Sequence, residues 1–392
     1  MRVRILCSFD SVAWLAYCAL LLGVTAIAQV GTPNLQMQIV QSAPGSGDPE
    51  AVSQDDPGAE KELQTGTALT RKGKFGEAIP HLLTARGRVE NEYAASFNLA
   101  LCYVGTRQYG SAISVLDGLR KDGHGNADVE NLLAQAYVGD GQSKLAYEAL
   151  ERAVSLTPTN ERLYLFVGDA CMVRRDYALG LKVAELGLKK VTNSARLHYQ
   201  RALFLSLLDE FDQARRDFEL ARKLLPMSEI SYLSAANEEL YAGNPTEATR
   251  WAREGINKGF ENPTLLTILG EALLRSGARA GEAEFVEAQA ALEKAIAMRP
   301  GDADAQTSLG KLHLAAGRTA DAIAHLEKAR ELDPGSPSVY ASLAKAYQRQ
   351  GHTQQAQEAL AELAKLNKAQ AEKISSAPGD RKVSYSVSGS DH

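Results

Sequence analysis

The sequence predicts an all-α solenoid, and three observations carry that prediction: a repeat, a pattern of small residues and a pattern of helix breakers. Nine segments recur from Ala59 with a period of 34 residues and one insertion. Each segment has Ala or Gly at its eighth position, from Gly66 to Ala344, and at its twentieth, from Ala78 to Ala356. A period in this range is typical of helical units that stack and bury a shared core.

The first 28 residues are expected to form a secretory signal peptide. Arg2 and Arg4 precede an uncharged apolar run from Val12, which ends in the small-residue pattern at 26–28. That order of charged, apolar and small residues precedes a cleavage site. An uncleaved membrane anchor is the alternative, because the apolar run reaches the lower limit of a spanning helix. Either way the repeats are expected to be exported, to the periplasm or the medium.

Residues 29–58 and 371–392 are expected to be a disordered leader and a disordered tail. The leader is rich in Pro, Gly, Ser, Gln and Asp, and the tail is rich in Ser. Such compositions offer too few large apolar residues to offset the entropy of ordering. Ile39 and Val40 in the leader could still dock on the repeats as an internal ligand. The solenoid itself is expected over residues 59–370.

Each segment is predicted to contain two amphipathic helices. Apolar residues recur at three- and four-residue spacing in both halves of a segment, as on the buried face of a helix. Glycine often occupies position 15, where a left-handed residue would end the first helix; these glycines are Gly73, Gly141, Gly243, Gly277, Gly317 and Gly351. Proline often occupies position 32, where it would stop the second helix; these prolines are Pro158, Pro226, Pro300 and Pro334.

The seventh segment needs 40 residues instead of 34, with six extra residues between Gly277 and Ala288. Either a longer connection between its two helices or an extra turn on the second helix would accommodate them. Insertions of this kind fall on one edge of a solenoid.

Charge and cysteine content exclude several functions. Without residues 1–28 the chain has 41 Lys and Arg against 47 Asp and Glu, which argues against binding to nucleic acid or anionic lipid. Cys102 and Cys171 lie on first helices separated by a whole segment, too far apart for a disulfide. Both are expected to be buried small hydrophobic residues.

The small residues, aromatics and prolines at these positions resemble the tetratricopeptide repeat over residues 59 to about 370. Aromatic residues occupy position 17 in Phe75, Tyr109, Tyr177 and Phe211. The resemblance implies a right-handed superhelix whose concave groove is lined by first helices and binds a peptide or protein segment. Through positions 2, 5, 9 and 12, that groove would present Phe97, Leu101, Asn131, Gln135, Arg162, Leu165, Arg196, Tyr199, Leu203, Leu233 and Asn237.

No catalytic or metal-binding residues and no cofactor are predicted. The sequence has no His-Glu-x-x-His or Cys-x-x-Cys motif, and Gly73-Lys74 lacks the Ser or Thr of a phosphate loop. The histidines are scattered, and His313 and His325 lie in one segment but on opposite helices. A lone histidine on a helix is more often structural or solvated than a ligand.

The expected function is a noncatalytic scaffold for protein–protein interaction, exported and acting in the cell envelope. An accessory subunit of an envelope enzyme or of a secretion or assembly machine is the alternative. Self-association through the last segment is a further possibility, because Tyr340 and Leu360 would be uncovered there. The sequence names no small-molecule substrate, and contact with a membrane is expected only if the N-terminal segment is retained.

Overall fold

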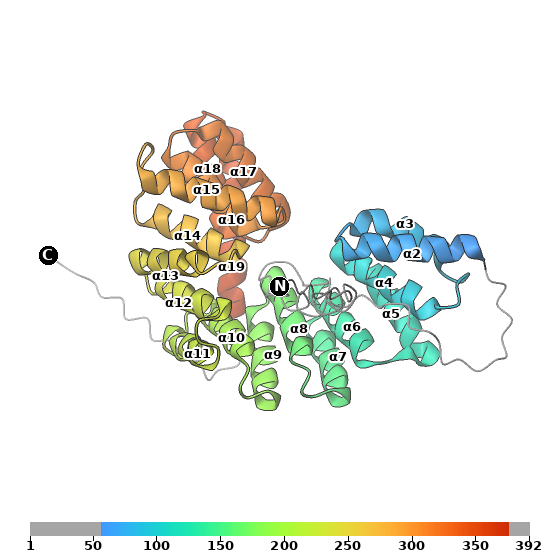
Figure 1. Cartoon of the computed structure of the whole chain (residues 1–392). Helices are drawn as coiled ribbons and strands as arrows, with labels where there is room; N and C mark the ends of the chain where they lie inside the picture. The colour runs from blue at the N-terminus through green and yellow to red at the C-terminus, as the bar shows by residue number, and fades with distance from the viewer. Residues whose placement is uncertain (1–55, 376–392) are drawn as a thin grey trace, which may run out of the picture.

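The structure, a computed structural model, describes residues 56–375 and there consists of eighteen α-helices in nine antiparallel pairs (Figure 1). The first helices of the pairs are α2 (Pro57–Arg71), α4 (Glu92–Gly105), α6 (Ala127–Gly139), α8 (Glu161–Arg174), α10 (Ala195–Leu207), α12 (Glu229–Tyr241), α14 (Pro263–Arg275), α16 (Ala303–Ala315) and α18 (Pro337–Arg349). The second helices are α3 (Phe75–Ala85), α5 (Tyr109–Leu119), α7 (Ser143–Leu156), α9 (Tyr177–Lys190), α11 (Phe211–Leu224), α13 (Pro245–Asn257), α15 (Ala283–Met298), α17 (Thr319–Leu332) and α19 (Thr353–Ser375). The all-α solenoid of nine repeats is therefore confirmed.

The predicted signal peptide, Ile39, Val40 and nearly all of the predicted leader and tail lie outside the described residues. A short π-helical turn, η2 (Arg120–His124), continues α5 and contains Gly123 at a φ of 86°. Below, repeat 1 is the pair α2 and α3, repeat 2 is α4 and α5, and so on to repeat 9.

Every first helix begins after a short polar residue. That residue is Asp, Asn or Ser, namely Asp56, Asn91, Asn126, Asn160, Ser194, Ser228, Asn262, Asp302 and Ser336. All of these except Ser336 accept a hydrogen bond from a backbone N–H of the first turn, which would otherwise have no partner. The pattern marks each helix start in the sequence.

The turns inside the pairs confirm the predicted role of position 15. All six glycines at this position have positive φ, between 71° and 89°. The three remaining repeats keep the same backbone conformation with a side chain present: Arg107, Arg175 and Asp209 have φ values of 61°, 58° and 62°.

The small residues at positions 8 and 20 are needed because neighbouring helices approach closely, both within a repeat and between successive repeats. A Cβ atom on Gly66 would lie 2.6 Å from the side chain of Leu82, and one on Gly180 would lie 2.3 Å from the ring of Phe204. Real Cβ atoms do not approach other atoms so closely. The buried apolar residues form one core from Ala59 to Leu312 and a second, smaller cluster from Leu314 to Ala359.

The insertion in the seventh segment mainly lengthens a connection. The turn between α14 and α15 runs from Ser276 to Glu282, whereas the other repeats use two or three residues there. The second helix starts at Ala283, two residues before Phe285, which occupies the position of the aromatic at the start of other second helices. Both alternatives contribute, and the longer connection takes most of the extra residues.

Two further local predictions, the proline stops and the buried cysteines, are also confirmed. The four second helices that precede a position-32 proline each end two residues before it. Cys102 and Cys171 are buried and free. Burial raises the pKa of the Cys102 thiol to about 11, so it is a poor nucleophile at neutral pH.

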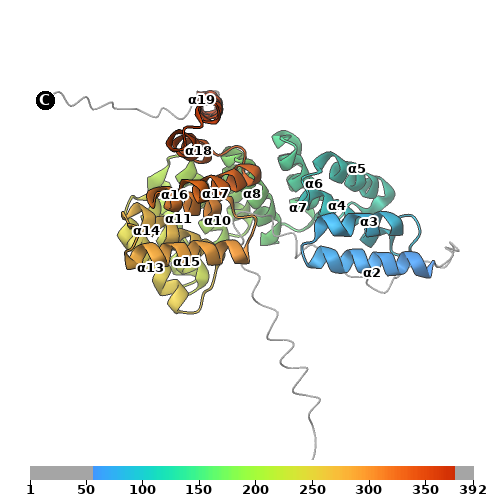
Figure 2. The ribbon, with the colours of Figure 1, turned by 90° about the horizontal axis from the view of Figure 1, so that it is seen from above.

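The stack curves strongly, so that distant repeats meet (Figures 1 and 2). The turn between α17 and α18 contacts the turns that end α4 and α8, through residues 158 and 225 positions apart in sequence. First helices of successive repeats pack on one another along the stack, and second helices do so much less. First helices therefore line the inner, concave side of the curve.

Candidate peptide-binding groove

The groove predicted from the sequence is partly filled by its own side chains. Six of the nine principal groove residues, each chosen for its place on a first helix, are no more than 8% exposed: Phe97, Asn131, Gln135, Tyr199, Leu233 and Asn237. Leu101 and Leu203 are buried as well. These positions contribute to the packing between helices, and their part in peptide binding stays a prediction.

The buried amides connect neighbouring repeats. The side chain of Asn131 in α6 donates a hydrogen bond to the backbone oxygen of Leu163 in α8, at 2.7 Å. Asn237 in α12 donates to the hydroxyl of Tyr199 in α10, at 2.9 Å. Buried polar groups of this kind must be paired, so they fix the register of one repeat on the next.

Three of the predicted residues remain accessible, and they lie on α8 and α10. Arg162 is exposed, with its guanidinium 5.4 Å from the centre of the Phe166 ring. Leu165 is half-buried, and Arg196 is half-buried with an ion pair of 3.5 Å to Glu161. This surface, Arg162, Leu165 and Arg196, is called the basic patch below.

A buried carboxyl group lies on the same face of α8 and was missed by the sequence analysis. Asp169 is 6% exposed and accepts a hydrogen bond of 2.9 Å from Gln200. Burial raises its pKa to about 8, and the hydrogen bond from Gln200 offsets only part of that rise. The carboxyl is therefore mostly protonated at pH 7.

Further along the concave side lie two carboxylates, Glu271 and Asp304, of which Glu271 pairs with Arg275 at 3.7 Å. Asp304 in α16 has an exposed side chain, yet the surrounding protein atoms raise its pKa to about 6, helped by Asp302 and Glu271. A side chain open to water can still be surrounded by the walls of a curved stack, and those walls disfavour its ionised form. Glu271 and Asp304 are called the acidic patch below.

Two tyrosines lie near these carboxylates. Burial raises the pKa of Tyr241 and of Tyr177, and the charge of Asp304 adds to both shifts. In the sequence, Tyr177 is marked only as an aromatic residue at position 17. A long-range contact brings Tyr177 near repeat 8, and no local pattern signals such a contact.

His313 and His325 were placed on opposite helices of one repeat by the sequence, and the structure brings them together. Their rings stack with centroids 5.2 Å apart, and Nδ1 of His325 is 2.8 Å from the Gln306 side-chain oxygen. Burial lowers the pKa of both imidazoles. Within residues 56–375 no group of three or more His, Cys, Asp or Glu side chains is arranged to hold a metal ion.

Tyr340 corrects the expectation of an uncovered last repeat. It is only 9% exposed and donates a hydrogen bond to the backbone oxygen of Pro334 at 3.2 Å. Leu360 is 43% exposed, as expected. Along the described part of the chain, no helix combines the length and apolar character needed to cross a membrane.

These features define an all-helical repeat protein with a concave face built from first helices. Models of the tetratricopeptide repeat match residues 69–136 and 313–374, residues 283–337 and residues 129–160. The chain is a tetratricopeptide-repeat protein. Such proteins are generally noncatalytic scaffolds for protein–protein interaction.

The chain is similar to several solved structures, whereas no curated protein matches it. One is the crystal structure of the APC/C hetero-tetramer Cut9–Hcn1, with 17% identity over 80% of this chain and 61% of that chain, at a TM-score of 0.48. Another is a tetratricopeptide repeat protein from Parabacteroides merdae, with 16% identity over 66% of this chain and 100% of that chain, at a TM-score of 0.47. The chain thus spans less than two thirds of the Cut9–Hcn1 chain.

Proposed function

We propose that the protein is an exported, noncatalytic scaffold that binds an extended protein segment along its concave face. The observation that carries this proposal is the basic patch on α8 and α10. There the half-buried Leu165 lies at position 5 of its repeat, with Arg162 on the same helix and Arg196 on the next. An apolar anchor beside guanidinium groups suits a segment with an apolar side chain next to a carboxylate.

The acidic patch gives the bound segment a direction. Glu271 and Asp304 lie on α14 and α16, two to four repeats along the concave face from the basic patch. A segment with acidic residues at one end and basic residues at the other would match both patches. Complementary charges of this kind mainly set register and the association rate.

Export and an envelope location are supported by the sequence of residues 1–28, which lie outside the described residues. The matched repeats support binding to proteins or peptides in general. The partner is identified here only by its chemistry, as an extended segment with an apolar anchor and charges of both signs.

A crosslinking pull-down from the native envelope tests the proposal. We would compare the wild type with a Leu165→Glu, Arg196→Glu variant. Tyr199 and Leu233 are unsuitable for this purpose, because a charge at either buried position would unfold the repeat. Leu145→Glu is the matched control, since Leu145 is 39% exposed on the second helix α7.

Partners that are captured by the wild type and by the control, and lost from the folded double variant, would support the groove as the site. The same partners on all three proteins would place binding elsewhere and overturn the proposal. An enzyme among the captured partners would favour the accessory-subunit role.

A further inference from the structure

Three of the nine turns between paired helices have a non-glycine residue in the left-handed region. Arg107, Arg175 and Asp209 occupy a position that is glycine in the other six repeats. A left-handed residue with a Cβ atom is strained, and strain kept at a particular place is a reason to look for a function. Arg107 and Arg175 share one feature that Asp209 lacks: their side chains reach the same distant segment.

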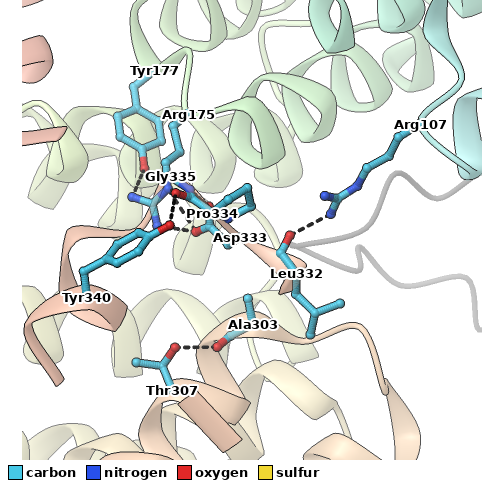
Figure 3. Close-up of polar contacts among 10 residues, drawn as sticks. All are labelled: Arg107, Arg175, Tyr177, Ala303, Thr307, Leu332, Asp333, Pro334, Gly335 and Tyr340. Carbon is cyan, nitrogen blue, oxygen red and sulfur yellow. Dashed lines mark hydrogen bonds and ion pairs between the residues drawn. The ribbon is translucent and has the colours of Figure 1, made fainter. Parts of the chain in front are cut away.

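That segment is the turn between α17 and α18, residues 332–335. The guanidinium of Arg175 forms an ion pair with Asp333 through two of its nitrogens (Figure 3). Nε donates to Oδ2 at 3.0 Å and to Oδ1 at 3.2 Å, and Nη2 donates to Oδ2 at 2.5 Å. Nη2 of Arg107 donates to the backbone oxygen of Leu332 at 2.7 Å. The turns of repeats 2 and 4 thus both bond to the turn between α17 and α18, near the far end of the stack.

Further hydrogen bonds orient both partners of the Arg175–Asp333 ion pair. Nη1 of Arg175 donates to the hydroxyl of Tyr177 at 3.1 Å, which fixes the plane of the guanidinium. The backbone N–H of Gly335 donates to Asp333 at 3.1 Å, which orients the carboxylate before it meets the arginine. The Arg175 and Asp333 side chains are 31% and 21% exposed, so water and salt screen the pair only partly.

Around the ion pair, the two surfaces enclose a small cavity of about 160 Å³. It is lined from one side by Val104 in α4, Tyr109 at the start of α5, Gly139 at the end of α6 and Ala170 in α8, and from the other by residues 332–335. A glycine at position 335 suits the close approach, because a Cβ atom there would lie 3.3 Å from Cδ of Arg175.

We propose that the turns of repeats 2 and 4 form a binding site for a carboxylate on a tight turn, and that Asp333 occupies this site in cis. The contact is a clasp that closes the superhelix into a ring. The clasp would also control access of a partner to the groove, and this part of the proposal rests on the function proposed above. The closing of the ring by the clasp does not depend on that function. An acidic partner segment would have to displace Asp333 from Arg175 and the Leu332 carbonyl from Arg107, and the ring would then open.

The clasp can be removed without creating new strain. Arg107→Gly with Arg175→Gly deletes both side chains and places glycine where the backbone already favours it. Spin-labelled noncanonical residues in place of Gly110 and Glu331 report the distance across the clasp by pulsed electron spin resonance. Both positions are exposed, and a side chain at Gly110 meets no atom within 4 Å.

Full-length wild type should show one narrow, short-distance population, and the double glycine variant should show a longer, broader one. Asp209→Gly is the matched control: it relieves the same kind of strain at a turn without the clasp, and its distances should equal those of the wild type. In the wild type, 1 M salt should also lengthen the distance, because it screens the ion pair.

Unchanged distances in the double glycine variant, with helical content intact by circular dichroism, would overturn the clasp. A lengthening in Asp209→Gly as well would assign the effect to turn flexibility and also overturn it. Neither result depends on whether the groove binds a peptide, so failure of the clasp and failure of the proposed function can be told apart.

Discussion

Different physical constraints decide which residue is tolerated in the packed middle of the helices and in the turns at their ends. In the middle, neighbouring side chains decide which residue is tolerated: Gly180 is small because the buried ring of Phe204 fills the space beside it. At the turns, the backbone decides: Gly243 has a φ of 79° and open space around the place of its Cβ atom. Two glycines in one fold are thus required for unrelated reasons.

This difference indicates where the protein can vary without losing its fold. A side chain added in the middle must displace a rigid neighbour, whereas one added at a turn must only bear a strained backbone. Arg107 and Arg175 occupy turns, and their side chains extend away from the repeat to a distant partner. The turns are therefore the part of each repeat that can acquire a new contact.

The largest effect is expected from a charge in the packed middle. Asp169 has a pKa raised to about 8 in the folded protein, against an ordinary value near 3.8. The unfolded chain loses this proton near pH 4 and the folded chain only near pH 8, so stability should fall as the pH rises between these values. Asp169→Asn should remove that loss, which these two pKa values put at about 5 kcal/mol at pH 8.

Urea unfolding at pH 4.5, 6 and 8 measures this effect. The gain from Asp169→Asn should be small at the lowest pH and grow steadily. Asp209→Asn, at an exposed carboxylate, should show no such trend. A gain in stability that is independent of pH would mean that the pKa of Asp169 in the folded protein equals its value in the unfolded chain.

The next effect is steric. Gly180→Ala would place a Cβ atom 2.3 Å from the ring of Phe204, which is fully buried and cannot move aside. We expect a loss of about 2 kcal/mol, as for other overpacked cores. The same substitution at Gly118, in a helix with no atom within 4 Å of the new Cβ, should stabilise by about 0.5 kcal/mol. Thermal unfolding of both variants makes the comparison, and equal effects would contradict a steric reason for Gly180.

The contrast between middle and turn also explains what the sequence could predict. The repeat, the helix pairs, the position-15 glycines and the proline stops depend on contacts within one repeat or between neighbours, and all are visible as a period. The exposure of individual groove residues was less predictable. Asn131 and Asn237 were chosen by position alone, and both are buried and hydrogen-bonded to a neighbouring repeat.

Long-range features left no periodic signal. Asp333 pairs with Arg175 across 158 residues because the whole stack curves, and curvature accumulates from small rotations that no single segment records. One cue was nevertheless present in the sequence. Arginine replaces glycine at position 15 in repeats 2 and 4, and a side chain at a position that favours glycine suggests a compensating contact.

A smaller effect is expected when a turn glycine is replaced away from the clasp. Gly243→Arg would impose left-handed strain on an arginine that has no distant partner in the described structure. We expect a loss of about 1 kcal/mol, with unchanged helical content. Chemical denaturation measures it, and Gly243→Asn is the matched control, because asparagine tolerates this conformation better. An unchanged stability for the arginine variant would show that these turns do not strain a side chain.

The smallest effect on stability is expected at the clasp itself. Arg175→Gly relieves left-handed strain, and it also removes an ion pair and leaves Asp333 without that partner, so the two contributions should nearly cancel within about 0.5 kcal/mol. Asp209→Gly relieves similar strain and removes no such pair, so it should stabilise by about 0.5 to 1 kcal/mol. Urea unfolding of both variants gives the difference between them, which measures the contribution of the clasp. If Arg175→Gly were as stabilising as Asp209→Gly, the ion pair would contribute nothing to the free energy of unfolding, and the strain at Arg175 would have no compensation.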